Sequence, residues 1–281
     1  MQLIRHRPAG PLAHYVNFFW WARRDDTQDF CEHILPSGGV QALFALHENR
    51  ILCMPGAPSQ RRIEWSGSMV HGPQWGYYVA GPKPRGTVAG VAFRSGGAGA
   101  VLGVPMAELA DHHISLSTLW GRRGQDLHER LRAAADPGSI FRILEQNLSA
   151  RIQRPLLIHP AVAHALCACS PTGSPTRVAE VQRETGYSPR HFIALFRAAV
   201  GITPKHYYRI QRFNSVARRL ASSPDCDLAD LAGSVGYSDQ AHLTREFREL
   251  SGVVPTQYRP GGSERALHHR VTDERHGRHI R

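Results

Sequence analysis

Lysine is scarce in this chain, so arginine supplies nearly all of the positive charge. Lys83 and Lys205 are the only lysines among 34 basic residues, which exceed the 23 acidic residues and leave a net charge of +11. Residues 1–153 carry 16 basic and 12 acidic side chains, whereas the shorter remainder carries 18 and 11. Arginine suits bidentate contacts to phosphate or guanine. The basic excess of the C-terminal part therefore predicts a polyanionic partner.

The cysteines lack the spacing of a cross-linked or zinc-binding protein. Five are present, at irregular intervals and without a CxxC pair: Cys31, Cys53, Cys167, Cys169 and Cys226. This pattern argues against a disulfide framework and a structural zinc site, so free thiols are expected.

Long apolar runs and catalytic motifs are lacking too. No stretch approaches the roughly 20 residues that span a membrane, and the N-terminus has no apolar run after its first charges. We therefore expect a soluble, cytoplasmic protein without a membrane partner. No P-loop, serine elbow or HExxH motif is present. Neither an enzyme nor a cofactor is expected.

The stretch from Gly236 to Gly252 predicts a tight turn followed by an amphipathic helix. Ser238 is expected to cap the helix through its hydroxyl, and Gly252 is expected to end it. Leu243, Phe247 and Leu250 recur at helical spacing and predict a buried face. The preceding segment, 227–235, predicts a shorter helix. The pair is typical of a helix-turn-helix, whose second helix enters the major groove of DNA, although an ordinary packed helix pair has the same pattern.

The helix-turn-helix pattern occurs twice. Residues 178–188 align with 228–238 at an offset of fifty, with like residues at the first four positions and identical residues at the last three. The offset then becomes fifty-one. The later matching pairs are Phe196 and Phe247, Arg197 and Arg248, Gly201 and Gly252, Pro204 and Pro255, and Tyr207 and Tyr258. This series predicts an internal duplication.

The duplicated segment, from about Leu156 to Tyr258, resembles the DNA-binding domain of the AraC/XylS family of bacterial transcription regulators. The residues that carry the resemblance most specifically are Gly236, Tyr237, Ser238, Asp239, Gln240, Ala241, His242, Leu243, Phe247, Gly252, Pro255 and Tyr258. The resemblance implies two helix-turn-helix subdomains on one rigid linker helix. The residues themselves predict that helix over 205–222, between Pro204 and Pro224. Its length of roughly 27 Å suits recognition helices in successive major-groove segments about 34 Å apart.

The expected DNA-contacting residues differ between the two units. In the second unit Gln240, Thr244 and Arg245 are expected to face the groove, and Arg248 is expected to be a phosphate contact or a solvated charge. Ala241 and Arg197 complete the expected DNA-binding set. The groove-facing positions that the resemblance implies for the first unit are Arg190, Ile193 and Ala194.

Residues 1–153 are expected to form a β-rich domain with a helical C-terminal part. Segments rich in aromatic and β-branched residues are cut by glycine and proline between Leu12 and Phe93, which favours a small barrel or sandwich. Helical spacing follows at 96–102, 105–109, 125–135 and 139–152. The fold class is therefore α+β, followed by an all-α double helix-turn-helix domain. The Leu-Pro-Ser-Gly turn at 35–38 and the stretches 93–98 and 102–109 resemble a subgroup of AraC-type regulators.

Histidines and aromatic residues are the candidates for a ligand site in this domain. His33, His47, His71, His112 and His113 invite a cupin-type metal hypothesis, but no His-x-His pair with a following glutamate is present, so no metal site is predicted. The rings that would line an apolar pocket if the strands close are Trp20, Phe44, Trp65, Trp75 and Tyr77. The alternative is that most of them form the core. A ligand is expected to act through the docking of helices 125–152 on the segment from His159 onward.

The domain boundaries follow from these patterns. The N-terminal sensing or dimerising domain is placed at 1–153 and the DNA-binding domain at 154–260, with its units at about 176–203 and 226–258 joined by helix 205–222. Residues 261–281 have too few apolar side chains to pack and are expected to form a disordered basic tail.

We therefore expect a one-component transcription regulator whose partner is double-stranded DNA. RNA polymerase, a small-molecule effector and a second copy of the chain, bound through the N-terminal domain, are further partners to be tested. Two alternatives are a DNA-alkylation repair protein with the same kind of DNA-binding domain, which would need a four-cysteine zinc site, and a metal-dependent β-barrel enzyme.

Overall fold

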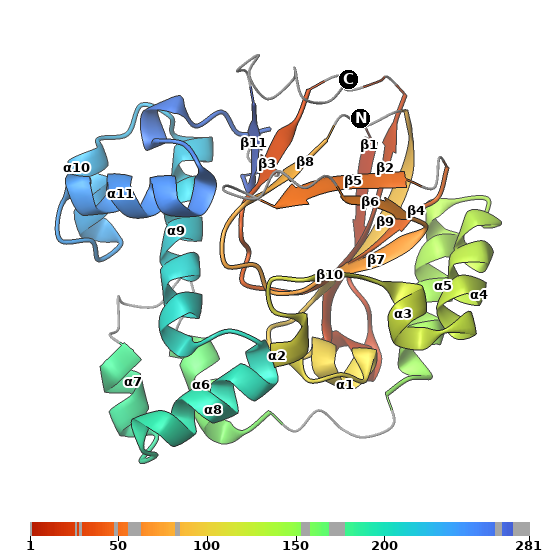
Figure 1. The fold of residues 1–281 in the computed structure, drawn as a ribbon, viewed down its shortest axis with the longest axis horizontal. Helices are drawn as coiled ribbons and strands as arrows, with labels where there is room; N and C mark the ends of the chain where they lie inside the picture. Colours follow the sequence, from red (N-terminus) through yellow and green to blue (C-terminus); the bar gives the residue numbers. More distant parts are fainter. Residues whose placement is uncertain are drawn as a thin grey trace.

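This computed structural model describes residues 2–25, 27, 30–47, 50–55, 63–81, 85–152, 158–168, 178–261 and 266–271, with the backbone alone at 50–55 and 63–66. The expected domain boundary between residues 153 and 154 lies outside these ranges. Strands dominate the first 115 residues and helices the rest (Figure 1). The expected α+β class is thereby confirmed.

The first sheet is antiparallel and six-stranded. In spatial order it contains β1 (Gln2–His6), β2 (Val16–Arg24), β9 (Gly86–Phe93), β4 (Gln41–Ala45), β7 (Ser68–His71) and β10 (His113–Ser115). Side chains alternate across a strand, and β2 shows the consequence. Phe19 and Trp21 are buried on one face. Trp20 points to the opposite face and lies over Gly90, where a Cβ would come within 2.3 Å of the indole.

The second sheet has five antiparallel strands. In spatial order these are β11 (His268–Arg270), β3 (Glu32–Ile34), β8 (Tyr78–Ala80), β5 (Arg50–Pro55) and β6 (Ile63–Ser66). Across the described ranges the strands form these two sheets and no closed barrel. The sequence favoured a small barrel or a sandwich, and the closed barrel is therefore wrong. The reason is that, in the part of the chain described, β7 pairs within the first sheet and β8 within the second, so the connector 72–77 crosses between sheets instead of extending one ladder.

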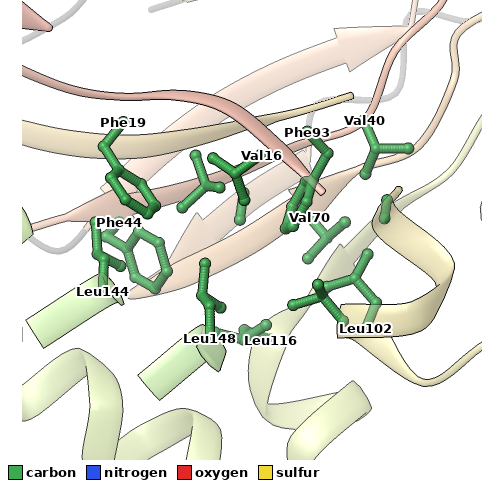
Figure 2. Packing of buried hydrophobic residues seen from close by; sticks show 14 of the residues in the cluster. Val16, Phe19, Val40, Phe44, Val70, Phe93, Leu102, Leu116, Leu144 and Leu148 are labelled. Atoms are coloured by element: carbon green, nitrogen blue, oxygen red, sulfur yellow. The ribbon is translucent and has the colours of Figure 1, made fainter. Parts of the chain in front are cut away.

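Helices cover one face of the first sheet. They are the short 3-10 helix η1 (Gly10–His14) and the α-helices α1 (Ala98–Leu102), α2 (Met106–Leu109), α3 (Leu116–Trp120), α4 (Arg122–Arg132) and α5 (Pro137–Ser149). Figure 2 shows Phe44 and Val70 of the sheet opposite Leu144 and Leu148 of α5 and Leu116 of α3. The helix α5 begins at Pro137, two residues before the expected start at 139, and the Asp136 carboxylate caps it by accepting a hydrogen bond from the Ser139 N–H at 3.0 Å.

The C-terminal part consists of helices around one long helix. They are α6 (Pro160–Ala168), α7 (Val178–Glu184), α8 (Pro189–Val200), α9 (Pro204–Ser222), α10 (Leu228–Ser234), α11 (Gln240–Ser251) and the 3-10 turn η2 (Pro255–Gln257). The helix α9 is the linker that the sequence predicted at 205–222, and it begins one residue earlier. No helix in the described part of the chain is both long enough and apolar enough to cross a membrane.

The C-terminal tail is not wholly disordered, which corrects the expectation for 261–281. His268 and Arg270 of β11 pair with Ile34 and Glu32 of β3. His269 and Glu32 are buried. The expectation was wrong here because it counted apolar side chains, whereas an edge strand such as β3 attracts another segment through its unpaired backbone groups. Backbone pairing, which composition does not report, therefore holds this segment against the N-terminal domain.

Removing β11 should lower the stability of the protein. A truncation after Gly261 deletes the strand and uncovers the edge of β3, so we expect the Tm in a thermal unfolding scan to fall by roughly 5 °C. A truncation after Val271 keeps the strand and is the control, with an unchanged Tm. Equal Tm values for the two truncations would contradict the paired strand.

Candidate nucleic-acid interface

The second helix-turn-helix consists of α10 and α11. The Asp227 carboxylate caps α10 by accepting from the N–H groups of Ala229 and Asp230 at 2.7 and 3.0 Å. The turn passes through Gly236 at a φ of +83°. Asp239 caps α11, accepting from the His242 N–H at 2.6 Å.

Asp239 takes the capping role that the sequence predicted for Ser238. The Ser238 hydroxyl instead donates to the Asp239 carboxylate at 3.1 Å. The correction has a physical reason, because Asp239 directly precedes the first helical residue and its charged oxygen is the stronger acceptor at the positive end of the helix dipole. The backbone hydrogen bond from His242 lowers the pKa of Asp239, and the hydrogen bond from Ser238 adds to this effect.

The first helix-turn-helix consists of α7 and α8. Here the serine is the cap: the Ser188 hydroxyl accepts from the His191 N–H, and Pro189 occupies the first helical position. Two glycines adopt left-handed backbone conformations. Gly186 lies in the turn at a φ of +72°, and Gly201 follows α8 at a φ of +95°.

All nine expected DNA-contacting residues lie on the solvent side of the two recognition helices. On α8, Arg190, Ile193, Ala194 and Arg197 are exposed. On α11, Gln240, Ala241, Arg245 and Arg248 are exposed and Thr244 is half-buried. Ile193 leaves 40% of its area open, which is unusual for a large apolar side chain in this structure.

The buried faces of both recognition helices pack on α9. Phe196 of α8 meets Tyr207 of α9 with ring centroids 5.6 Å apart, and Phe247 of α11 meets Phe213 of α9 at 5.0 Å. Phe196 and Phe247 are equivalent residues of the duplicated units. One 19-residue helix, about 28 Å long, therefore anchors both recognition helices.

A buried carboxylate distinguishes the second unit from the first. Glu246 of α11 is only 5% exposed. It accepts hydrogen bonds from Arg209 Nε at 2.9 Å, from Arg212 Nη2 at 2.8 Å and from the Tyr237 hydroxyl at 2.8 Å. The Arg212 guanidinium also stacks over the Tyr237 ring at 4.1 Å. These contacts bind α11 to α9 by charge-assisted hydrogen bonds.

The first unit differs at the two matching positions. Leu195 stands where the second unit has Glu246, and Tyr187, which matches the buried Tyr237, is 37% exposed. Sequence reasoning missed the network because it compared the units for identity. The signal was available: a glutamate among the apolar positions of α11, and two arginines three residues apart, Arg209 and Arg212, on the linker helix.

Burial of Glu246 favours its neutral form and would raise its pKa. The hydrogen bonds from Arg209, Arg212 and Tyr237 outweigh this effect, so that its pKa lies below the usual 4.5. The carboxylate therefore stays charged in the folded protein under all conditions near neutral pH.

The N-terminal domain touches the C-terminal end of both recognition helices. A Cβ on Gly201, just after α8, would lie 2.7 Å from the Met106 carbonyl oxygen and 2.9 Å from Pro73 Cγ. A Cβ on Gly252, just after α11, would lie 2.6 Å from the Tyr77 ring. Pro73 and Tyr77 belong to one short segment, the β7–β8 connector (residues 72–77), which thus reaches from one helix-turn-helix to the other.

The Leu-Pro-Ser-Gly turn at 35–38 docks on the linker helix. The Ser37 carbonyl accepts hydrogen bonds from Gln211 Nε2 at 3.1 Å and Asn214 Nδ2 at 3.3 Å. Leu35 is buried in the hydrophobic cluster of the second helix-turn-helix, beside Phe213 and Leu250. The motif that marked this domain in the sequence is therefore an interdomain contact.

Two histidines add further contacts between the domains. His33 Nδ1 donates to the Ser251 carbonyl oxygen at 2.8 Å, near the end of α11. His206 Nε2, at the start of α9, donates to the Trp75 carbonyl oxygen at 3.0 Å.

Of the five rings expected to line a ligand pocket, the four whose side chains the structure describes do not come together. Phe44 lies in the core beneath the helices, and Trp20 lies on the opposite face of the same sheet. Trp75 is 52% exposed beside His206, and Tyr77 stacks on His33 at 4.3 Å. The side chain of Trp65 falls outside the described part of the chain. The expectation depended on the strands closing into a barrel, whereas the described strands form two separate sheets.

The structure also gives no metal cluster among the residues it describes: nowhere do three His, Cys, Asp or Glu side chains gather in a way that could hold an ion.

Two family models match the chain. One, described as a helix-turn-helix domain, covers residues 181–261, and the other, a domain of unknown function, covers residues 4–115.

Several known regulators are similar to the C-terminal part. The multiple antibiotic resistance protein MarA of Escherichia coli K12 is 31% identical over 98 residues, which are 34% of this chain and 76% of MarA. The arabinose operon regulatory protein of the same organism is 31% identical over 88 residues, 31% of this chain and 30% of that regulator. The chain thus spans less than a third of the arabinose regulator's length.

A solved structure that aligns with most of this chain is that of apo ToxT from Vibrio cholerae strain SCE256, in a form that carries one substitution. The alignment covers 85% of this chain and 95% of ToxT, at 10% identity and a TM-score of 0.47.

Neutralising Glu246 should weaken the second unit. Glu246→Gln leaves Arg209 and Arg212 without their buried partner, and we expect a loss of about 2–4 kcal/mol in the free energy of unfolding at pH 7. Because the folded pKa is lowered, the carboxylate stabilises the fold above the unfolded pKa near 4.5, and this contribution is lost as pH falls through the folded pKa. Urea unfolding from pH 7 to pH 3 should therefore show a shallower pH dependence in the variant.

The control is Glu249→Gln, which removes the exposed partner of Arg209. Its expected cost is below about 1 kcal/mol. Equal losses for the two variants would mean that the burial of Glu246 has no energetic consequence.

Proposed function

The chain belongs to the AraC family of transcriptional regulators, and we propose that it regulates transcription by binding double-stranded DNA through α8 and α11. The observation that carries this proposal is the pair of exposed faces on two recognition helices whose buried faces are fixed to one linker helix. A rigid spacer of about 28 Å suits two helices that enter successive major-groove segments on one side of the duplex.

The chemistry of α11 fits direct reading of base edges. Gln240 can pair with adenine through its amide, and Arg245 can pair with guanine through its guanidinium. Arg248 lies one turn further along and suits a phosphate oxygen. On α8, Arg190 is the residue with the strongest base-reading chemistry, while Ile193 and Ala194 offer apolar contact to a thymine methyl group.

We propose that the N-terminal domain controls the placement of the two recognition helices. The route differs from the expected one through helices 125–152, because contacts near the recognition helices come from the β7–β8 connector, α2 and the turn at 35–38. A small molecule that binds this domain would act through its different affinities for two arrangements of the domains. Contact with RNA polymerase and dimerisation through the N-terminal domain stay predictions.

Arg245 should determine specificity, and Arg248 should determine affinity. DNA fragments bound by the full-length protein can be selected from a random library and sequenced. For Arg245→Ala we expect lost preference at one base pair, with ~1–3 kcal/mol less discrimination there. For Arg248→Ala, the matched control, we expect weaker binding to all sequences alike. If the two variants return the same motif as the unchanged protein, the assignment of Arg245 is wrong. Failure to enrich any sequence would contradict the proposed function as a whole.

The two half-sites should be read with different stringency. Because α8 offers one base-reading polar side chain and α11 offers several, the half-site of α8 should show fewer conserved base pairs in the selected motif. Replacing Ile193 by Gln introduces an amide at a groove-facing position and should add an adenine preference to that half-site. Equal information content in both halves before the change would count against this prediction.

A further inference from the structure

A pair of histidines lies between the two sheets of the N-terminal domain. His71 of β7 and His113 of β10 are directly opposite each other in the strand pairing. Their ring centroids are 4.4 Å apart at an interplanar angle of 85°. Tyr78 of the second sheet stacks on His71 at 5.1 Å and meets His113 edge-on at 4.9 Å. The three rings therefore form one cluster across the intersheet space.

His71 is buried and His113 is half-buried, and three of their four ring nitrogens have no hydrogen-bond partner among the described residues. His71 is 5% exposed, and neither of its ring nitrogens has a hydrogen-bond partner among the described residues. The same is true of His113 Nδ1. Burying a polar atom without a partner typically costs about 1–3 kcal/mol, so such atoms in a native protein call for an explanation. A role in binding a molecule from outside the chain provides one.

Both imidazoles are neutral at physiological pH. Burial lowers the pKa of His113 to about 4, helped by the nearby His112. Burial likewise holds the pKa of His71 well below its usual value, and His113 adds to that effect. A neutral imidazole has one N–H donor and one acceptor nitrogen. The pair can therefore donate to a ligand and accept from it at the same time.

Near the cluster, the face of the first sheet that carries His71 also carries the polar residues Gln41 and Ser115, paired with His71 and Met69, besides apolar side chains. Leu43 and Met69 are paired in the strand register and share the face of His71, because opposite residues of antiparallel strands point the same way. Trp20 lies on this face too, over Gly90. Among the rings that were expected to line a pocket and whose side chains are described, Trp20 is the one that lies on this face of the sheet.

We propose that His71, His113 and Tyr78 form the binding site of a small, mainly apolar molecule that carries a neutral hydroxyl group. A hydroxyl donates one hydrogen bond and accepts another, which matches two neutral imidazoles. A carboxylate only accepts and an ammonium only donates, so neither could accept from one imidazole and donate to the other. That this molecule is an effector rests on the proposed function of the chain as a regulator.

The cluster lies where the β7–β8 connector, the segment that touches both recognition helices, begins and ends. His71 precedes Gly72 and Pro73, and Pro73 abuts Gly201 at the end of α8. Tyr78 follows Tyr77, which abuts Gly252 at the end of α11. His113 directly follows His112, whose carbonyl oxygen accepts from the Gly72 N–H at 3.0 Å. A ligand bound against the three rings would thus contact both ends of the β7–β8 connector.

The test uses the full-length protein with ¹⁵N-labelled histidine and three probes that share a phenyl ring: benzyl alcohol, benzoate and benzylamine. We expect benzyl alcohol to shift the imidazole ¹⁵N resonances of His71 and His113, but not that of His128 on α4. Benzoate and benzylamine at the same concentration should leave all three unchanged. A fourth arm adds Zn²⁺ alone.

Substitutions test whether the ¹⁵N shifts arise from binding of benzyl alcohol at the histidine cluster. His71→Leu and His113→Leu should each weaken benzyl alcohol binding roughly three- to tenfold, as expected for the loss of one neutral hydrogen bond. His128→Leu, the control, should bind as the unchanged protein does. His71→Leu should also raise the Tm, because it removes two buried polar atoms without partners. A histidine with a structural role alone would lower it.

The outcomes separate this proposal from the function on which it rests. No shift with benzyl alcohol, equal shifts with all three probes, or a response to Zn²⁺ alone would overturn the proposed ligand class. Fluorescence anisotropy with a selected DNA fragment then measures DNA affinity with and without benzyl alcohol. Binding at the cluster that leaves DNA affinity unchanged would overturn the effector role. A protein that binds no DNA at all would instead refute the proposed function and leave the result on the cluster standing.

Discussion

The close approach of the N-terminal domain to Gly201 and Gly252 is the contact on which the arrangement of this molecule depends. Both glycines end a recognition helix in the left-handed conformation, and both face a neighbour where a side chain would collide. Helix termination and domain docking therefore use the same two residues. The recognition helices are held from two sides, by α9 on the inner face and by the N-terminal domain at their C-terminal ends. If the N-terminal domain shifts relative to the recognition helices, either both helix ends move with it or one of the contacts at Gly201 and Gly252 breaks.

The two helix-turn-helix units share a fold but not the forces that hold them to α9. The second unit uses a buried carboxylate with two arginines and a tyrosine, so its attachment is directional and depends on charge. The first unit uses Leu195 and the aromatic contact of Phe196 with Tyr207, which tolerate small rotations better than hydrogen bonds do. The difference in attachment parallels the difference between their DNA-facing surfaces, where the second unit carries more hydrogen-bonding side chains.

The histidines of the intersheet cluster illustrate how a functional site departs from the rules that stabilise a core. An apolar side chain at His71 would pack without leaving a polar atom unpaired. The chain places an imidazole there, next to a second one and beside the connector that reaches both recognition helices. Local rules of folding fail most often where function requires it, and this cluster is such a place in the N-terminal domain.

The sequence by itself determined most of the helices, the duplication and the solvent face of each recognition helix, because helical spacing and capping act between residues a few positions apart. It indicated Leu35–Gly38 and the paired glycines without saying what they touch. Only the tertiary structure decided that the tail pairs with β3, that Glu246 is buried among arginines, and that His71 meets His113 and Tyr78. These contacts join segments separated by up to 236 residues, and no local pattern encodes which distant surfaces will meet.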